Sequence, residues 1–246
     1  MGGVGVLSGL VHGVCLLVRG RTVAAGAASA AATGGDDKEA QRRLDGKRFS
    51  LRLRFGCTGP APEKDARRGW SFDEKRRLLR VRAASDLMAD TQLLKELPLG
   101  TYEAAQGFWI DRPWLLVAAC PVLSPAAGND AVPSDPSSPD AQIPAQPMFR
   151  LGIVQLYSED DARTHRRDGR AYEASKTLPE GAKPSAVGYD LVVSGRLKRL
   201  TDRSAIACSL GKNPALPPSC VMGAEFDRVA IEEPGDETVL AEWTSI

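Results

Sequence analysis

The chain has 246 residues, of which 43% are hydrophobic and 26% are charged, and its formal net charge is +1. This composition excludes an intrinsically disordered chain and an integral membrane body. After a leader is set aside, the remaining length suits one large domain or two small ones.

Residues 1–32 are interpreted as a signal peptide or apolar leader. The apolar part, residues 4–18, is short for a membrane span, which takes about 20 residues, and the small residues at 24–32 are typical of a cleavage site. Arg19 and Arg21 follow the apolar part, an arrangement that favours an uncleaved anchor with a cytoplasmic body. We favour a cleaved export signal. A membrane-anchored cytosolic domain and a disordered cytosolic extension stay open as alternatives.

Residues 33–47 are polar and charged, and we expect them to form a flexible approach to the folded body. Between Lys38 and Arg82 the chain has 15 Lys or Arg residues against 6 Asp or Glu residues. Such an excess is compatible with binding to anionic lipid, polysaccharide or nucleic acid. Many of these arginines occupy alternate positions, so the solvated face of a sheet is our preferred explanation.

Residues 48–120 form a predicted β-rich lobe that begins with the clearest strand of the chain. Apolar and polar residues alternate strictly there, which predicts one buried face; the apolar set is Phe49, Leu51, Leu53, Phe55 and Cys57. Residues 70–72 and 79–83 then predict a hairpin with its turn at 73–75. The spacing of leucines predicts one short helix within 86–97, ended by Pro98, and strands follow at 107–110 and 114–120.

Residues 121–147 contain seven prolines without any periodicity, which indicates a long Pro-rich loop or an interdomain linker. The segment 148–246 is a second predicted β-rich lobe, and whether it forms one domain with 48–120 stays open. Its expected strands are 149–157, 189–195, 204–210, 219–226, 229–232 and 238–243. The pattern predicts a mainly β protein, an antiparallel β-sandwich or barrel-like sheet with at most one short helix.

Cysteine usage favours an oxidising compartment. Cys15 lies in the leader, and the body has an even number of cysteines, as expected for disulfides in a secreted or envelope protein: Cys57, Cys120, Cys208 and Cys220. Three connectivities are possible; local spacing favours Cys208 with Cys220, which leaves Cys57 with Cys120 by elimination. We expect no metal site, because the body has no C-x2-C pair and one histidine.

No catalytic residue and no cofactor are assigned. The single histidine of the body, His165, lies in a charged stretch that we interpret as a surface loop, and the chain has no nucleophile elbow, phosphate loop or zinc-protease motif. Glycoside hydrolysis needs only two carboxylates. A carboxylate-dependent hydrolase acting on envelope glycans is therefore an alternative, and its candidate acids are Glu103, Asp111, Glu159, Asp160, Asp161 and Asp190.

The most distinctive local cluster contains Trp109, Asp111, Arg112 and Trp114. Two tryptophans that flank a charged pair suit a platform for a sugar or a peptide. Alternatively, the tryptophans complete the core at a corner between two strands, and we favour this simpler role.

Taken together, these features predict an exported, disulfide-stabilised, noncatalytic envelope or periplasmic protein with a binding or structural role. Its ligand stays unidentified; an envelope glycan or another envelope protein is the expected partner, and nucleic acid is not.

Overall fold

The computed structural model describes residues 44–61, 67–97, 99–110, 150–160, 165–201, 204–209 and 218–245. Over this part the chain is mainly β with one short helix, which confirms the predicted fold class, and neither sheet is closed into a barrel. The elements in chain order are β1 (Arg48–Phe55), β2 (Arg68–Asp73), β3 (Leu78–Ala83), β4 (Asp86–Leu87), α3 (Gln92–Glu96), β5 (Ala104–Ile110), β6 (Arg150–Tyr157), β7 (Tyr172–Thr177), β8 (Tyr189–Leu197), β9 (Ile206–Ser209), β10 (Ser219–Glu232) and β11 (Val239–Thr244).

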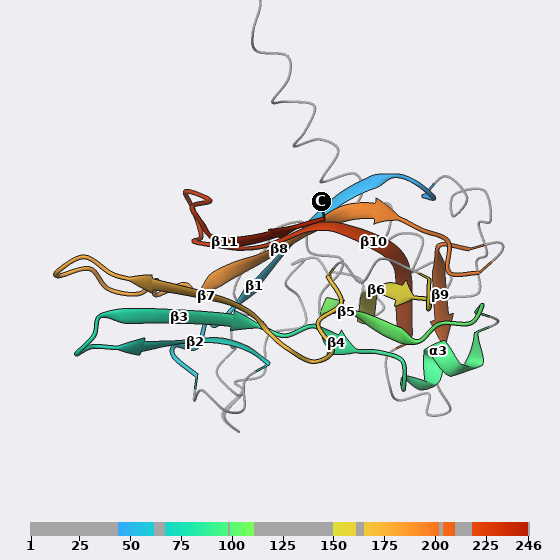
Figure 1. The fold of residues 1–246 in the computed structure, drawn as a ribbon, viewed down its shortest axis with the longest axis horizontal. Coiled ribbons are helices and arrows are strands. Elements are labelled where there is room, and N and C mark those ends of the chain that lie inside the picture. Colours follow the sequence, from blue (N-terminus) through green and yellow to red (C-terminus); the bar gives the residue numbers. More distant parts are fainter. Residues whose placement is uncertain are drawn as a thin grey trace, which may run out of the picture.

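The strands form two sheets (Figure 1). The larger has the order β1-β8-β10-β6-β5-β4, with β9 and β11 also paired to β10; the smaller has the order β2-β3-β7. The pairing of β10 with β6 is parallel, and the other pairings are antiparallel. Strand β10 connects the two parts of the larger sheet, because its first residues pair with β6 and β9 and its later residues with β8 and β11.

Strands from the two predicted lobes are interleaved in both sheets. Strand β1 pairs with β8, β5 pairs with β6, and β3 pairs with β7, so each of these pairs joins a strand before residue 120 to one after residue 148. Each of these six strands contributes buried residues to the same hydrophobic cluster. The predicted leader, most of the polar approach and the Pro-rich segment 121–147 lie outside the described residues.

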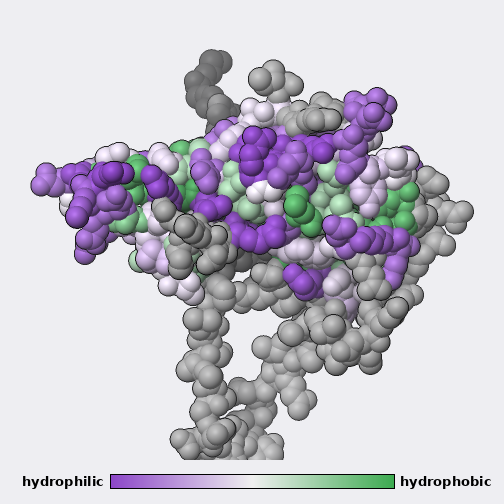
Figure 2. Space-filling model, turned by 60° about the horizontal axis from the view of Figure 1, so that its bottom comes forward, coloured by the Kyte–Doolittle hydropathy of each residue, from purple (hydrophilic) through white to green (hydrophobic). Residues whose placement is uncertain are grey.

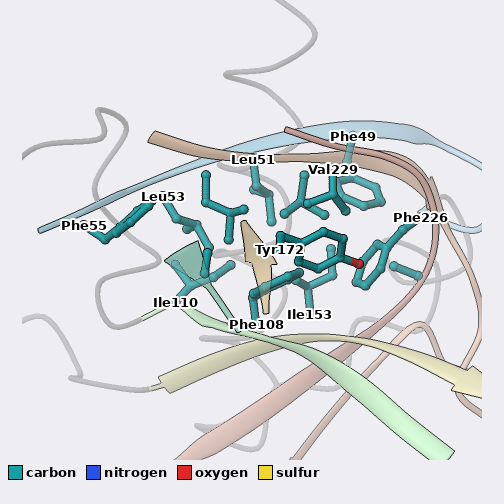
Figure 3. Close-up of a cluster of buried hydrophobic side chains, with 14 of the residues drawn as sticks. Phe49, Leu51, Leu53, Phe55, Phe108, Ile110, Ile153, Tyr172, Phe226 and Val229 are labelled. Atoms are coloured by element: carbon teal, nitrogen blue, oxygen red, sulfur yellow. The ribbon is translucent and has the colours of Figure 1, made fainter. Parts of the chain in front are cut away.

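The apolar side chains of β1 form one layer of the hydrophobic core, the upper one in the view of Figure 3. Phe49, Leu51, Leu53 and Phe55 are buried, as predicted, and the polar residues between them lie on the opposite face of the sheet. Cys57, the fifth member of the predicted apolar set, lies beyond the end of β1 and is only half-buried, because the strand ends at Phe55. Figure 3 shows the four buried side chains pointing toward Phe108 and other side chains of the lower layer. Each large apolar side chain buried in this way contributes roughly 1.5–3 kcal/mol to folding.

Sequence and structure differ most around the predicted helix 86–97. The structure has only α3 there, and Asp86–Leu87 forms β4, which pairs with β5. The helix starts later because Thr91, its N-cap residue, has an extended backbone and its side-chain hydroxyl donates to the main-chain oxygen of Met88. Residues of α3 pack on a second, smaller hydrophobic cluster that includes Met88. No helix in the described part of the chain is long and apolar enough to cross a membrane.

Two further differences concern strands of the second lobe. The runs 219–226 and 229–232 form one strand, β10, which contains a bulge between Phe226 and Arg228. Strand β7 was not predicted, because most of its residues are polar; only Tyr172 and Ala174 are buried. Other predicted strands are confirmed within a few residues, while residues 114–120 lie outside the described range.

One disulfide closes the end of the larger sheet. Cys208 on β9 and Cys220 on β10 are direct cross-strand partners and are bonded to each other, the pairing that local spacing favoured. Cys57 is also disulfide-bonded. Cys120, its partner by elimination, lies outside the described residues.

Candidate functional site

Trp109 is the one residue of the predicted binding cluster that the structure describes; Asp111, Arg112 and Trp114 lie outside the described residues. Trp109 is half-buried on β5, opposite Gly152 of β6. A Cβ atom at position 152 would lie 3.2 Å from ring atoms Cε3 and Cζ3 of Trp109. The absence of a side chain at Gly152 therefore lets the indole pack closely against β6.

The guanidinium of Arg150 covers the indole ring. Its Cζ atom lies 4.7 Å from the ring centroid of Trp109, while the Arg150 side chain is exposed to solvent. An exposed cation–π contact of this kind contributes about 0.5–1 kcal/mol and fixes the orientation of the planar group. Among the described residues, no carboxylate forms an ion pair with Arg150.

Asp86 holds the main chain beside this ring. Its Oδ2 atom accepts a hydrogen bond from the Trp109 N–H at 3.1 Å. Arg67 and Arg68 each approach the same carboxylate to 3.3 Å, and Nη2 of Arg68 also donates to the main-chain oxygen of Trp109 at 3.4 Å. The short strand β4 brings Asp86 to this position by pairing with β5.

We call this group the Trp109 patch: Arg67, Arg68, Asp86, Trp109 and Arg150. The patch contains three guanidinium groups and one carboxylate, and two of the guanidinium groups form ion pairs with that carboxylate. The patch therefore has an excess of positive charge and one exposed, oriented guanidinium. Such a group recognises carboxylates and phosphates through paired N–H donors.

Sequence reasoning missed the arginines of the patch, because they lie at the start of β2, just before it, and at the start of β6, far from Trp109 along the chain. The basic excess between Lys38 and Arg82 was a partial signal, since it includes Arg67 and Arg68. Nothing in the sequence indicated that Arg150 would stack on Trp109.

The predicted acids are dispersed. Glu103 pairs with Arg166 at 2.6 Å, and Asp190 is buried between Arg52 and Arg54. Glu159 and Asp160 are exposed just beyond β6, while Asp111 and Asp161 lie outside the described residues. In the described part of the chain, Asp86 is the single carboxylate bonded to Trp109 or to an arginine of the patch. The patch thus lacks the second carboxylate that glycoside hydrolysis requires.

His165 contacts the C-terminal end of the described chain. Its Nε2 atom lies 3.2 Å from Oγ of Ser245. The same Oγ atom is also a hydrogen-bond donor to the main-chain oxygen of Phe226, at 3.1 Å. The main-chain oxygens of Phe226 and Asp227 compete with His165 for the Ser245 hydroxyl, whereas a nucleophile is hydrogen-bonded to its base. Burial lowers the pKa of His165 and Arg167 lowers it further, while a main-chain hydrogen bond with Asp227 and the charge of Asp227 oppose the change.

This lowered pKa predicts a pH dependence of stability. The folded protein binds a proton at His165 less readily than the unfolded chain, so the free energy of unfolding is expected to fall as the pH decreases below about 6.5. Chemical denaturation at pH 7.5 and pH 5.5 measures this change. The His165→Gln variant serves as the control and is expected to lose less stability over the same interval; an equal loss in both proteins would refute the assignment.

Comparisons with known proteins give no family for the chain: no protein-family model, no curated protein and no solved structure matches it.

Proposed function

We propose that this protein is an exported, disulfide-stabilised, noncatalytic envelope protein, periplasmic or secreted, that binds an acidic glycan at the Trp109 patch. The ligand class is a polysaccharide or oligosaccharide that contains uronic acids. The observation that carries the proposal is the exposed guanidinium of Arg150, which is held over the Trp109 ring and has no carboxylate partner among the described residues.

The chemistry of the patch supports an acidic sugar over a neutral one. Uronic acids carry a carboxylate on a ring, and Arg150 presents coplanar N–H donors that match a carboxylate. Arg68 adds positive charge beside the same tryptophan, since its Nη2 atom is bonded to the Trp109 main chain. Asp86 is occupied by Arg67 and Arg68, so its charge is largely compensated.

The disulfide and the leader support the export part of the proposal. The bond between Cys208 and Cys220 is expected to persist in an oxidising compartment. N-terminal sequencing of the native protein tests export directly: removal of residues 1–32, or of a similar length, is expected. Retention of Arg19 and Arg21 would favour the membrane-anchored cytosolic alternative instead.

Calorimetric titration with a trigalacturonate tests the ligand. We expect binding that weakens with rising salt, and a loss of about tenfold in affinity for Arg150→Ala, because a hydrogen bond to a charged group contributes about 1.5–3 kcal/mol. Arg150→Lys keeps the charge but loses the planar donors, so an intermediate affinity is expected. The matched control is Arg196→Ala, which removes an exposed arginine from β8.

Three outcomes would contradict the proposal. If a neutral trisaccharide binds with equal affinity, the carboxylates of the ligand are not recognised. If Arg150→Ala and Arg196→Ala lose the same amount of affinity, the ligand does not bind at the Trp109 patch. Release of reducing sugar from the oligosaccharide would support the carboxylate-dependent hydrolase instead.

A further inference from the structure

A cavity of about 160 Å³ lies at the hairpin end of the protein, between the β7–β8 loop and the β10–β11 turn. Figure 2 shows that hydrophilic side chains dominate this end of the face in view. The cavity is separate from the Trp109 patch: Leu79, which lines it, is near the start of β3, whereas Arg68 pairs with Ala83 at the end of that strand. Loops gathered at one end of a sandwich are a common place for ligand sites.

The floor of the cavity includes the side chain of Tyr189, which is buried. The Tyr189 hydroxyl accepts a hydrogen bond from the Ser185 N–H at 3.3 Å. Burial raises the pKa of Tyr189, so the hydroxyl keeps its proton at neutral pH. Within the described range no residue is placed to accept that proton.

The walls of the cavity carry both signs of charge. Glu233 and Asp236 supply carboxylates, and Lys183 supplies an exposed ammonium group. Glu233 is also paired with Lys176, whose Nζ atom lies 3.1 Å from Oε1. Because acidic and basic groups are present together, the lining favours a neutral ligand that both donates and accepts hydrogen bonds.

The size and the apolar part of the lining restrict the ligand further. The volume is about that of an engineered protein cavity, roughly 150 Å³, that admits one benzene ring. Leu79 and Leu178 provide apolar wall beside the polar groups. From this combination we propose that the cavity binds one uncharged polyhydroxyl ring, such as a single neutral sugar unit.

Binding is favoured over hydrolysis at this site. A glycosidase needs one carboxyl group that stays protonated to act as the general acid. The main-chain N–H of Thr238 donates to Asp236 at 3.0 Å, and hydrogen bonds from this residue lower the pKa of Asp236. Glu233 is held in its ion pair with Lys176. Asp236 is therefore unsuited to act as the general acid.

Nuclear magnetic resonance titration tests this inference independently of the proposed function. The neutral probes are methyl glycosides of glucose, mannose, galactose and N-acetylglucosamine; ethylammonium and acetate are the charged probes. At least one neutral probe is expected to shift the amide signals of Ser185, Gly188 and Gly235, with a smaller response from both charged probes. Signals from the Trp109 patch are expected to stay unchanged, so failure here leaves the acidic-glycan proposal standing.

Substitutions of residues that line the cavity test whether the neutral probe binds there. Glu233→Gln and Lys183→Ala are each expected to weaken the neutral probe by about tenfold. The control is Glu225→Gln, because Glu225 forms an exposed pair with Lys198 at 2.9 Å and does not line the cavity. A response to ethylammonium alone, no response to any probe, or an equal effect of Glu225→Gln would overturn the inference. Cleavage of a nitrophenyl hexoside that Glu233→Gln abolishes would overturn it in favour of hydrolysis.

Discussion

Replacing Asp190 with asparagine is expected to lower the free energy of unfolding by about 3 kcal/mol. The carboxylate of Asp190 is 1% exposed and lies between two arginines of β1. Arg54 donates to it through Nε and, at 3.1 Å, through Nη2, while Nη1 of Arg52 donates at 3.3 Å. Asparagine removes the charge and turns an N–H₂ group toward the arginines. Because both arginine side chains are partly exposed, we expect the lower end of the range known for broken buried pairs.

Urea denaturation followed by fluorescence measures the effect, with an unchanged dependence on urea showing that the unfolding reaction is the same. The exposed pair between Lys198 and Glu225 supplies the control, since Glu225→Gln is expected to cost less than about 1 kcal/mol. The double variant Arg54→Met with Asp190→Leu is expected to recover part of the loss, because Arg52 keeps its pairs with Glu232 and Glu237 and no unpaired charge remains. A loss for Asp190→Asn no larger than that for Glu225→Gln would contradict the role of this network.

Removing the Cys208–Cys220 disulfide is expected to lower the free energy of unfolding by about 3 kcal/mol. The bond closes a segment with a sequence separation of 12, and it attaches β9 to β10 at the end of the larger sheet. Without it, the unfolded chain regains the freedom that the closed segment had lost. The variant for this test replaces both cysteines by alanine, and urea denaturation measures the difference from the unmodified protein.

Reductant provides the matched comparison. It is expected to lower the free energy of unfolding of the unmodified protein more than that of the double alanine variant. Any loss of stability that reductant still causes in the variant is attributed to the bond made by Cys57. Alkylation with and without prior reduction checks the chemistry. Free alkylation of Cys208 and Cys220 in the native protein would refute the disulfide and weaken the argument for export.

The sequence by itself determined the fold class and the strand β1, and it favoured the Cys208–Cys220 pairing among three connectivities. The alternation of apolar and polar residues in β1 has the period of a strand, and every apolar member is buried. The two cysteines are close in the chain, so a local hairpin-like approach was enough to pair them. Each of these inferences depends on residues that are neighbours in the sequence.

Only the tertiary structure decided the rest. Strand β7 has a polar sequence and forms because β3 supplies its hydrogen-bonding partner, and β10 continues through a bulge because β8 pairs on both sides of it. The Trp109 patch and the cavity beside Tyr189 bring together side chains from strands and loops far apart in the chain. The physical reason is that pairing and packing between distant segments set these positions, and no periodicity within a single segment records them.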